Sequence, residues 1–329
     1  MKKYTLKKST FKEDSATEEH RRLTIDYKNQ LNPAQYEAVT SVNGPHLIVA
    51  GAGTGKTRTI TYRVAYLVEL GVRPEAILLL TFTRRAAQEM LRRASILLDA
   101  RCEGVSGGTF HSFANTVLRQ YAPLLGFNSS FTILDQGDAE DVVNLLRTQL
   151  KLDTKEKRFP RKQTLFGIFS RAVNTLVPVA DIVKEEYAHY EDSVDDIVKL
   201  QSAYERYKAA HNLMDYDDLL LHLRKLLRDV TAVRKTLAAR FTYIMVDEYQ
   251  DTNRIQAEIV ALLAGAHGNI MVVGDDAQSI YSFRGATVRN ILDFPEQFSG
   301  CRIITLEENY RSTQPILNLT NEILRRGRE

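Results

Sequence analysis

Short, nearly continuous apolar runs recur in two separated parts of the chain, and each is followed by polar or glycine-rich residues. Residues 46–50, 76–82, 241–246 and 269–274 form these runs. Runs of this length are typical of strands that are buried on both faces of a parallel sheet. Helical patterns follow the first two runs. This alternation predicts an α/β fold with a parallel sheet, in which ligands meet the carboxyl ends of the strands.

Helical periodicity alone dominates residues 115–235. The apolar positions include Val142, Val143, Leu146, Leu165, Ile168, Phe169, Ala172, Val194, Ile197 and Leu200. We interpret this block as an all-helical insertion, which divides the α/β domain into residues 30–114 and 236–305. Residues 1–29 are polar and of mixed charge, which predicts a flexible arm. Its lysines can contact phosphates, although a solvated tail is the simpler interpretation.

Composition is that of an ordinary globular protein. At 329 residues the chain suggests about two domains, and its hydrophobic content is 44%. The two cysteines, Cys102 and Cys301, have no metal-binding or redox spacing, and the first residues lack the apolar core of a signal peptide. We therefore expect a cytoplasmic protein. A net charge of +3 is too small to indicate nucleic-acid binding by itself.

The most informative segment lies between the first apolar run and the helix that follows it. Residues 50–57 read Ala-Gly-Ala-Gly-Thr-Gly-Lys-Thr, which is typical of a phosphate-binding loop although it opens with alanine instead of glycine. Glycines let successive N–H groups point into one concavity, and the helix N-terminus adds partial positive charge. Lys56 would reach the β- and γ-phosphates of a nucleoside triphosphate, and the Thr57 hydroxyl would hold Mg²⁺.

Two residues far from this loop are candidates for binding the base. Gln35 lies on the first turn of a helix that Asn32 and Pro33 begin, and its amide can bind both N6 and N7 of adenine. Tyr310 can stack on the adenine. The full set of nucleotide-binding candidates is Gln35, Ala50, Gly51, Ala52, Gly53, Thr54, Gly55, Lys56, Thr57, Arg58 and Tyr310.

Adjacent carboxylates follow the strand at 241–246. Phosphoryl transfer needs a metal ligand and a group that orients or deprotonates water. Asp247 suits the first role and Glu248 the second. Gln278, at the end of the next strand, is placed to sense the γ-phosphate, and Arg311 can act as an arginine finger.

Aromatic, hydroxyl and cationic residues at other element boundaries suit single-stranded nucleic acid, because aromatic rings stack on bases while hydroxyls contact phosphates. The candidates are Phe82, Thr83, Thr109, His111, Tyr281, Phe283 and Arg284. Taken singly, the segments of Phe82 and Phe110 are better explained by core positions for these two rings.

Two charged segments leave alternatives open. Residues 151–162 are rich in lysine and arginine, which fits either a phosphate-contacting loop or a solvated surface loop. Asp215, Asp217 and Asp218 can bind a metal, but a favourable interaction with a helix dipole explains them more simply.

The order of these motifs resembles the N-terminal half of UvrD/Rep/PcrA-type DNA helicases of superfamily 1A. The matching segments are 31–35 (Q motif), 50–57 (Walker A), 81–90 (Ia), 109–113 (Ib), 246–253 (II), 274–286 (III) and 306–313 (IV). Phe283 stands where the family often has tryptophan, and Arg84-Arg85 replaces its usual Asn-Lys.

The resemblance implies a RecA-like P-loop NTPase domain that uses ATP and Mg²⁺, binds single-stranded DNA and single-strand/duplex junctions, and translocates 3′ to 5′. It also implies that residues 306–329 begin a second RecA-like domain, which the chain does not complete. We therefore expect nucleotide binding from residues 1–329, with little hydrolysis and no unwinding. The alternatives are a non-enzymatic chain that binds nucleotide or DNA and regulates a partner, and the helicase half of a helicase–nuclease.

Overall fold

The computed structural model describes residues 23–152, 159–281 and 285–326. Its centre is a parallel sheet of six strands in the order β3-β2-β6-β7-β1-β8. The strands are β1 (His46–Ala50), β2 (Ile77–Thr81), β3 (Ser106–Thr109), β6 (Tyr243–Val246), β7 (Ile270–Gly274) and β8 (Arg302–Leu306). This confirms the predicted α/β fold. The sequence pattern did not single out β3 as a strand, because its residues, Ser-Gly-Gly-Thr, have no apolar side chains.

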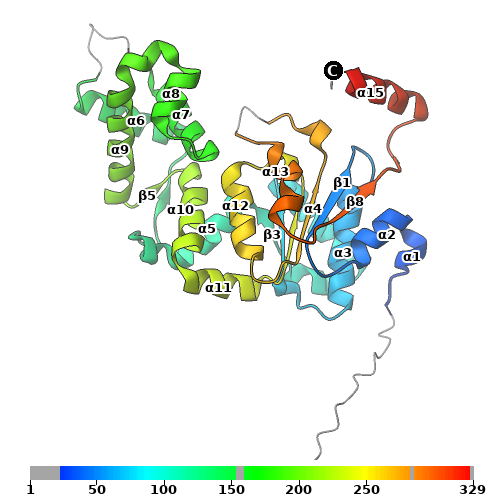
Figure 1. Ribbon diagram of the computed structural model, residues 1–329. Coiled ribbons are helices and arrows are strands. Elements are labelled where there is room, and N and C mark those ends of the chain that lie inside the picture. Colours follow the sequence, from blue (N-terminus) through cyan, green and yellow to red (C-terminus); the bar gives the residue numbers. More distant parts are fainter. Residues whose placement is uncertain (1–22, 153–158, 282–284, 327–329) are drawn as a thin grey trace, which may run out of the picture.

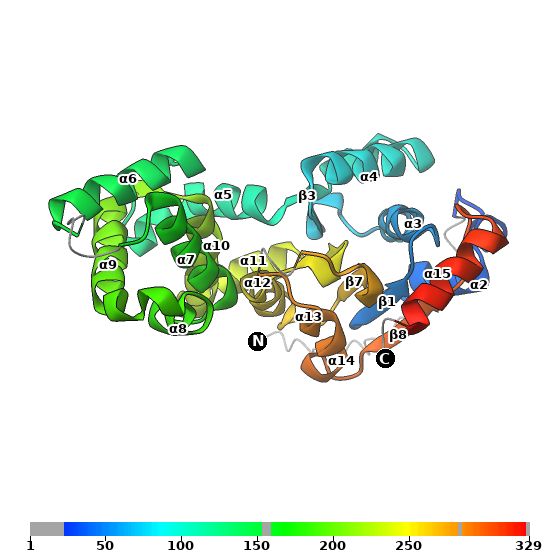
Figure 2. The ribbon, with the colours of Figure 1, turned by 90° about the horizontal axis from the view of Figure 1, so that it is seen from above.

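Helices cover both faces of the sheet (Figures 1 and 2). Alternate residues of one strand face opposite layers, so Leu78 and Leu80 of β2 belong to one hydrophobic cluster while Ile77 and Leu79 belong to the other. One layer holds α2 (Pro33–Thr40), α3 (Lys56–Glu69) and α4 (Arg84–Leu97). The other holds α5 (Phe110–Tyr121), α10 (Tyr216–Asp229), α11 (Thr231–Arg240), α12 (Arg254–Ala264), α13 (Arg289–Leu292) and α14 (Phe294–Gln297).

A separate helical lobe stands to one side of the sheet (Figure 1). It consists of α6 (Gln136–Gln149), α7 (Lys162–Thr175), α8 (Val179–Glu186) and α9 (Val194–Ala210), which enclose their own hydrophobic cluster. A short parallel pair, β4 (Thr132–Ile133) with β5 (Leu213–Met214), lies where the chain enters and leaves the lobe. The lobe is smaller than the expected insertion at 115–235, because α5, α10 and α11 pack in the cluster that also holds the sheet.

The predicted flexible arm, residues 1–29, includes residues that the structure places in a helix. Tyr27, which we assigned to it, lies in α1 (Tyr27–Gln30) and is 3% exposed. Its hydroxyl donates a hydrogen bond to Glu69 Oε2 (2.6 Å), and its ring packs edge-on against Tyr62 and Tyr66. The polar composition of residues 1–29 does not reveal this contact, because Tyr27 packs against tyrosines that lie far away in the sequence. Residues 1–22 lie outside the described part of the chain.

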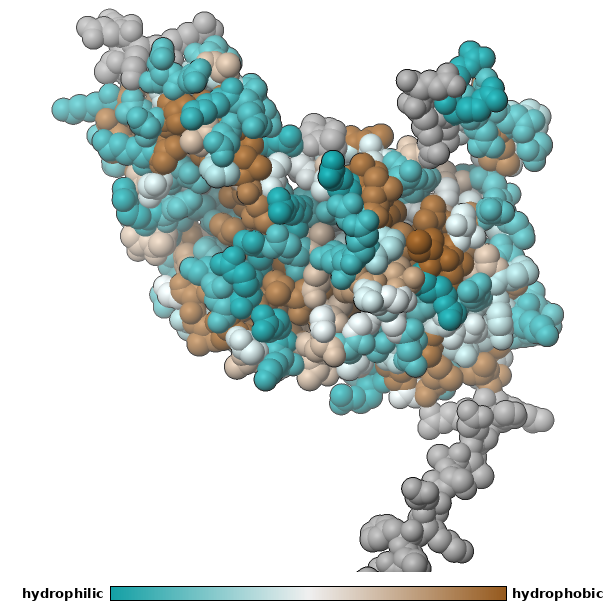
Figure 3. Space-filling model, in the orientation of Figure 1, coloured by the Kyte–Doolittle hydropathy of each residue, from teal (hydrophilic) through white to brown (hydrophobic). Residues whose placement is uncertain are grey.

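The C-terminal helix α15 (Gln314–Arg326) extends away from the sheet (Figures 1 and 2). The space-filling view shows apolar groups on its surface (Figure 3), and Ile316, Leu319 and Ile323 are more than half exposed. That residues 306–329 begin a second domain stays a prediction. Among the described residues no single helix is both long and apolar enough to cross a membrane, although the bent pair α7–α8 meets these criteria together.

A buried ion-pair network fastens α9 of the lobe to the start of α10. Lys208 Nζ lies 2.7 Å from Asp215 Oδ2 and 2.6 Å from Asp218 Oδ2, and the Tyr204 hydroxyl donates to Asp215 as well. Asp215 and Asp218 also form a capping box at the N-terminus of α10. These two carboxylates therefore have a structural role, and no group of three metal-ligating side chains occurs within the described ranges.

We predict that Lys208→Ala destabilises the protein by about 3–5 kcal/mol, because it leaves two buried carboxylates without their counter-ion. Urea unfolding measures the loss. The matched control is Lys199→Ala, which removes an exposed lysine from the same helix. Equal stability of the two variants would contradict the role assigned to Lys208.

Candidate nucleotide-binding site and nucleic-acid cleft

The turn between β1 and α3 has the backbone of an anion-binding loop. Gly53 and Gly55 adopt left-handed conformations, with φ of +83° and +90°. Both positions are also too crowded for a side chain, since a Cβ would lie 2.7 Å from Arg311 Cβ at Gly53 and 2.6 Å from Gln35 Nε2 at Gly55. The helix begins at Lys56, and Gly55 has no side chain with which to cap it. The N–H groups of the first turn of α3 are therefore available to a phosphate.

Gln35 lies directly behind this loop. It is 2% exposed, and its Nε2 donates to the carbonyl of Thr54 at 3.1 Å. Its Oε1 forms the capping box of α2 with the N–H of Asn32. In the structure the amide thus supports the loop, and contact with an adenine through both amide atoms would require it to rearrange. Adenine binding by Gln35 stays a prediction.

The segment after β8 lies across the other side of the loop. Asn309 Nδ2 donates to the carbonyl of Ala52 (2.6 Å), and the N–H of Tyr310 donates to the carbonyl of Gly53 (2.9 Å). The ring of Tyr310 is 61% exposed, and its hydroxyl accepts a hydrogen bond from Asn32 Nδ2. Tyr310 and Arg311 therefore lie beside the loop, while adenine stacking by Tyr310 and the arginine-finger role of Arg311 stay predictions. The sequence analysis missed the contact of Asn309, because a single asparagine in a loop carries no distinctive signal.

An ion pair joins the loop to the carboxyl end of β6. Lys56 Nζ lies 2.9 Å from Glu248 Oε2, and Gln250 Nε2 donates to the same oxygen at 2.9 Å. Glu248 has a φ of +51°, an unfavourable conformation for a residue with a side chain. Gln250 is held in turn by the N–H of Asp275 after β7 (3.1 Å). The parallel sheet thus brings residues of three strands together at one edge.

Asp247 is a buried carboxylate without a counter-ion of its own. It is 5% exposed, and its Oδ1 has no hydrogen-bond partner among the described residues. Burial, followed by the nearby charge of Glu248, raises the pKa of Asp247 to about 7. Asp251 Oδ1 is unpartnered in the same way, and burial raises the pKa of Asp251 to about 6. Unpartnered carboxylate oxygens fit a hard divalent cation, and Mg²⁺ needs few protein ligands because phosphates and water supply the rest.

Gln278 and Tyr281 follow β7 at the same edge of the sheet. Gln278 Nε2 donates to Asp275 Oδ2 at 2.5 Å, so its amide is held near the ends of β6 and β7. Tyr281 stacks on Phe82, with ring centroids 5.1 Å apart and 30° between the planes. This pair joins two candidates for nucleic-acid binding from distant parts of the chain. Phe283 and Arg284 lie outside the described residues.

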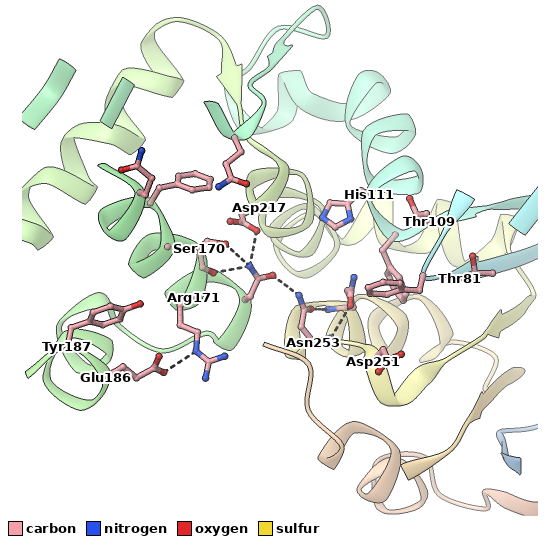
Figure 4. A pocket seen from close by; sticks show the side chains of 18 residues that line it. Thr81, Thr109, His111, Ser170, Arg171, Glu186, Tyr187, Asp217, Asp251 and Asn253 are labelled. Atoms are coloured by element: carbon pink, nitrogen blue, oxygen red, sulfur yellow. Dashed lines mark hydrogen bonds and ion pairs between the residues drawn. The ribbon is translucent and has the colours of Figure 1, made fainter. Parts of the chain in front are cut away.

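A cavity of about 910 Å³ separates the sheet from the helical lobe. Figure 4 shows Thr81, Thr109 and His111 on one side and Ser170, Arg171 and Tyr187 on the other. Phe82 lines it as well, and its side chain is 38% exposed. Burial lowers the pKa of His111, which favours the neutral ring. The cavity is lined by aromatic rings and by several polar groups. These are the kinds of side chain that can bind unpaired bases.

Two of the candidate hydroxyls in this region have structural partners. Thr83 Oγ1 accepts the N–H of Ala86 at the start of α4, and Thr109 Oγ1 accepts the N–H of Ser112 at the start of α5. Both threonines are therefore helix N-caps, which stabilise helix starts. A phosphate would have to accept a hydrogen bond from the O–H group of either threonine. The DNA-binding role of Thr83 and Thr109 therefore stays a prediction.

Comparison with known proteins agrees with this geometry. Residues 31–299 match the family model described as the UvrD/REP helicase N-terminal domain. The chain is 40% identical over 302 residues to a protein of Staphylococcus aureus named ATP-dependent DNA helicase PcrA, an alignment that covers 92% of this chain and 40% of the relative. The protein of the same name from Bacillus subtilis is 40% identical over 296 residues, covering 90% of this chain and 39% of the relative.

The chain thus spans about two fifths of the length of these relatives. The family match covers most of the chain, including the phosphate-binding loop and the carboxyl ends of β6 and β7. On this basis the chain belongs to the UvrD/REP helicase family.

Proposed function

We propose that this chain carries the nucleotide site and part of the DNA track of an ATP-dependent DNA helicase that moves 3′ to 5′ along single-stranded DNA. The observation that carries the proposal is the ion pair between Lys56 and Glu248 beside an uncapped glycine-rich loop. A cation that can meet phosphates and a carboxylate that can act on water are paired there. The names of the relatives support ATP as the nucleotide and DNA as the partner.

In this proposal each residue of the chain has a separate task. The N–H groups of residues 51–57 and the Lys56 ammonium bind the phosphates of ATP. Thr57 and Asp247 hold Mg²⁺, which neutralises phosphate charge when it is bound. Glu248 orients and deprotonates the attacking water, Gln278 senses the γ-phosphate, and Arg311 stabilises the charge that develops on it.

Nucleotide binding requires a rearrangement at the ion pair. Lys56 cannot make its full contact with a phosphate while its ammonium is bound to Glu248 at 2.9 Å. The phosphate therefore competes with Glu248 for Lys56. When Lys56 turns to the phosphate, the Glu248 carboxylate loses its ion-pair partner, and its Oε2 becomes available to accept a hydrogen bond from water. The same exchange thus binds the nucleotide and prepares Glu248 for its task.

DNA would bind along the cavity between the sheet and the lobe. Phe82 and Tyr281 form the base platform. Tyr281 of this platform and Gln278 both follow β7 and lie three residues apart in the chain, whereas Phe82 follows β2. A change at the γ-phosphate can therefore reach the base platform through a short segment of chain.

We predict that Lys56→Ala weakens the binding of Mg²⁺-ATP roughly tenfold or more, because a hydrogen bond to a charged group contributes about 1.5–3 kcal/mol. Titration with a fluorescent ATP analogue measures the change. Lys235→Ala removes an exposed lysine from α11 and serves as the control. Equal affinities of the two variants would remove Lys56 from the nucleotide site.

Glu248→Gln has the opposite effect on binding. An exposed or partly exposed ion pair contributes about 0.2–1 kcal/mol, so the loss of this competitor tightens nucleotide binding by up to about fivefold. Any hydrolysis stimulated by single-stranded DNA falls to background, because a neutral amide cannot deprotonate water. The same titration and a phosphate-release assay measure both effects. Unchanged hydrolysis would show that Glu248 is not the base.

Phe82→Ala removes half of the stacked pair. We expect the affinity for oligothymidylate to fall by about 1–3 kcal/mol, the usual contribution of a base stacked on an aromatic ring. Fluorescence anisotropy of a labelled oligonucleotide measures it. Ile96→Ala, which shortens an exposed apolar side chain on α4, is the control, and an effect of equal size there would argue against the platform.

A further inference from the structure

Asn174 lies at the end of α7 that faces the sheet, and its amide joins three elements. Its Nδ2 donates to Asp217 Oδ1 at 2.8 Å, in the first turn of α10, and to the carbonyl of Ser170 at 2.9 Å. Its Oδ1 accepts a hydrogen bond from Asn253 Nδ2 at 2.6 Å. Figure 4 shows Ser170, Asp217 and Asn253 close together at the cavity.

The bond to Asn253 reaches the segment that carries Glu248. Asn253 caps α12 through a reciprocal pair of hydrogen bonds with Gln256 (both 2.9 Å), so its side chain is fixed. A single turn, Tyr249–Asp251, separates Glu248 from this cap. Any displacement of Asn253 therefore acts on a short and tightly bonded segment next to the candidate base.

Gly285, seven residues after Gln278 in the chain, lies close to Asn174. Gly285 has a φ of +79°, and a Cβ at this position would lie 3.1 Å from Asn174 Cβ. The next residue, Ala286, forms an antiparallel bridge with Asn253, and the N–H of Thr287 donates to the carbonyl of Thr252. The backbone after Glu248 and the backbone after Gln278 are thus joined to each other, and both contact the same asparagine of the lobe.

We propose that Asn174 is a positioning residue that transmits the state of the nucleotide site to the helical lobe. The inference rests on the proposed function, because it assumes that nucleotide binding moves Glu248. The task requires an amide, since the side chain must donate to Asp217 and accept from Asn253 at once. A carboxylate would lose the donor, and an apolar side chain would leave the Asn253 amide without its partner.

Hydrogen–deuterium exchange tests this transmission directly, with Mg²⁺ and the non-hydrolysable analogue adenosine 5′-(β,γ-imido)triphosphate as the probe. In the wild type we expect the analogue to slow exchange in residues 51–57 and to change exchange in residues 170–175 of α7 by about fivefold or more, the lower range of coupling between distinct sites. In Asn174→Ala the response of residues 51–57 remains, whereas the response of α7 is lost.

Two controls separate transmission from a loss of folding. Asn144→Ala replaces a partly exposed asparagine of α6 in the same lobe and keeps both responses. If Asn174→Ala does not fold, two substitutions of its partner Asp217 take its place in the experiment. Asp217→Asn preserves an oxygen acceptor for Asn174 and keeps the response of α7, whereas Asp217→Ala loses it.

A response of α7 that persists in Asn174→Ala, or that is missing from the wild type although residues 51–57 are protected, would overturn the proposal. If the wild type shows no protection of residues 51–57, the nucleotide site itself is wrong, and the proposal about Asn174 is overturned with it. The two failures are distinguishable because they concern different peptides.

Discussion

The ion pair between Lys56 and Glu248 is the contact on which the rest of the site depends. The two residues are 192 positions apart in the chain, and they meet because β1 and β6 both pair in parallel with β7. Parallel pairing places the carboxyl ends of all three strands at one edge of the sheet. A helix starts after β1, a strained glutamate follows β6, and a polar loop follows β7. The charge of each partner is balanced by the other.

This arrangement explains why several polar groups at the site lack partners while others are fully bonded. Gln250 and Asp275 are held by hydrogen bonds that fix Glu248 and the end of β7. Asp247, in contrast, is buried, its Oδ1 has no hydrogen-bond partner in the described part of the chain, and its pKa is raised to about 7. A cation next to Asp247 would stabilise its ionised form and restore an ordinary pKa. The proposed metal would thus offset the free-energy cost of burying this carboxylate.

Much of this site could be predicted from the sequence, because local patterns specify it. The phosphate-binding loop needs glycines, a lysine and a following helix in a fixed order, and the Asp-Glu pair follows an apolar strand. Contacts between distant segments could not be predicted in this way. Tyr27 was placed in a flexible arm because only its burial against Tyr62 and Tyr66 reveals its role. The predicted limits of the lobe, residues 115–235, are too wide. Periodicity shows that α5 and α10 are helices, but it does not show that they pack in the hydrophobic core of the sheet.

The central claim is that ATP takes Lys56 from Glu248. A crystal structure of this chain with Mg²⁺ and the non-hydrolysable ATP analogue tests it most directly. The account predicts that Lys56 Nζ contacts the β- and γ-phosphates, that the metal lies next to Asp247 and Thr57, and that the 2.9 Å contact between Lys56 and Glu248 is broken. An intact ion pair, with the nucleotide bound elsewhere, would contradict the account.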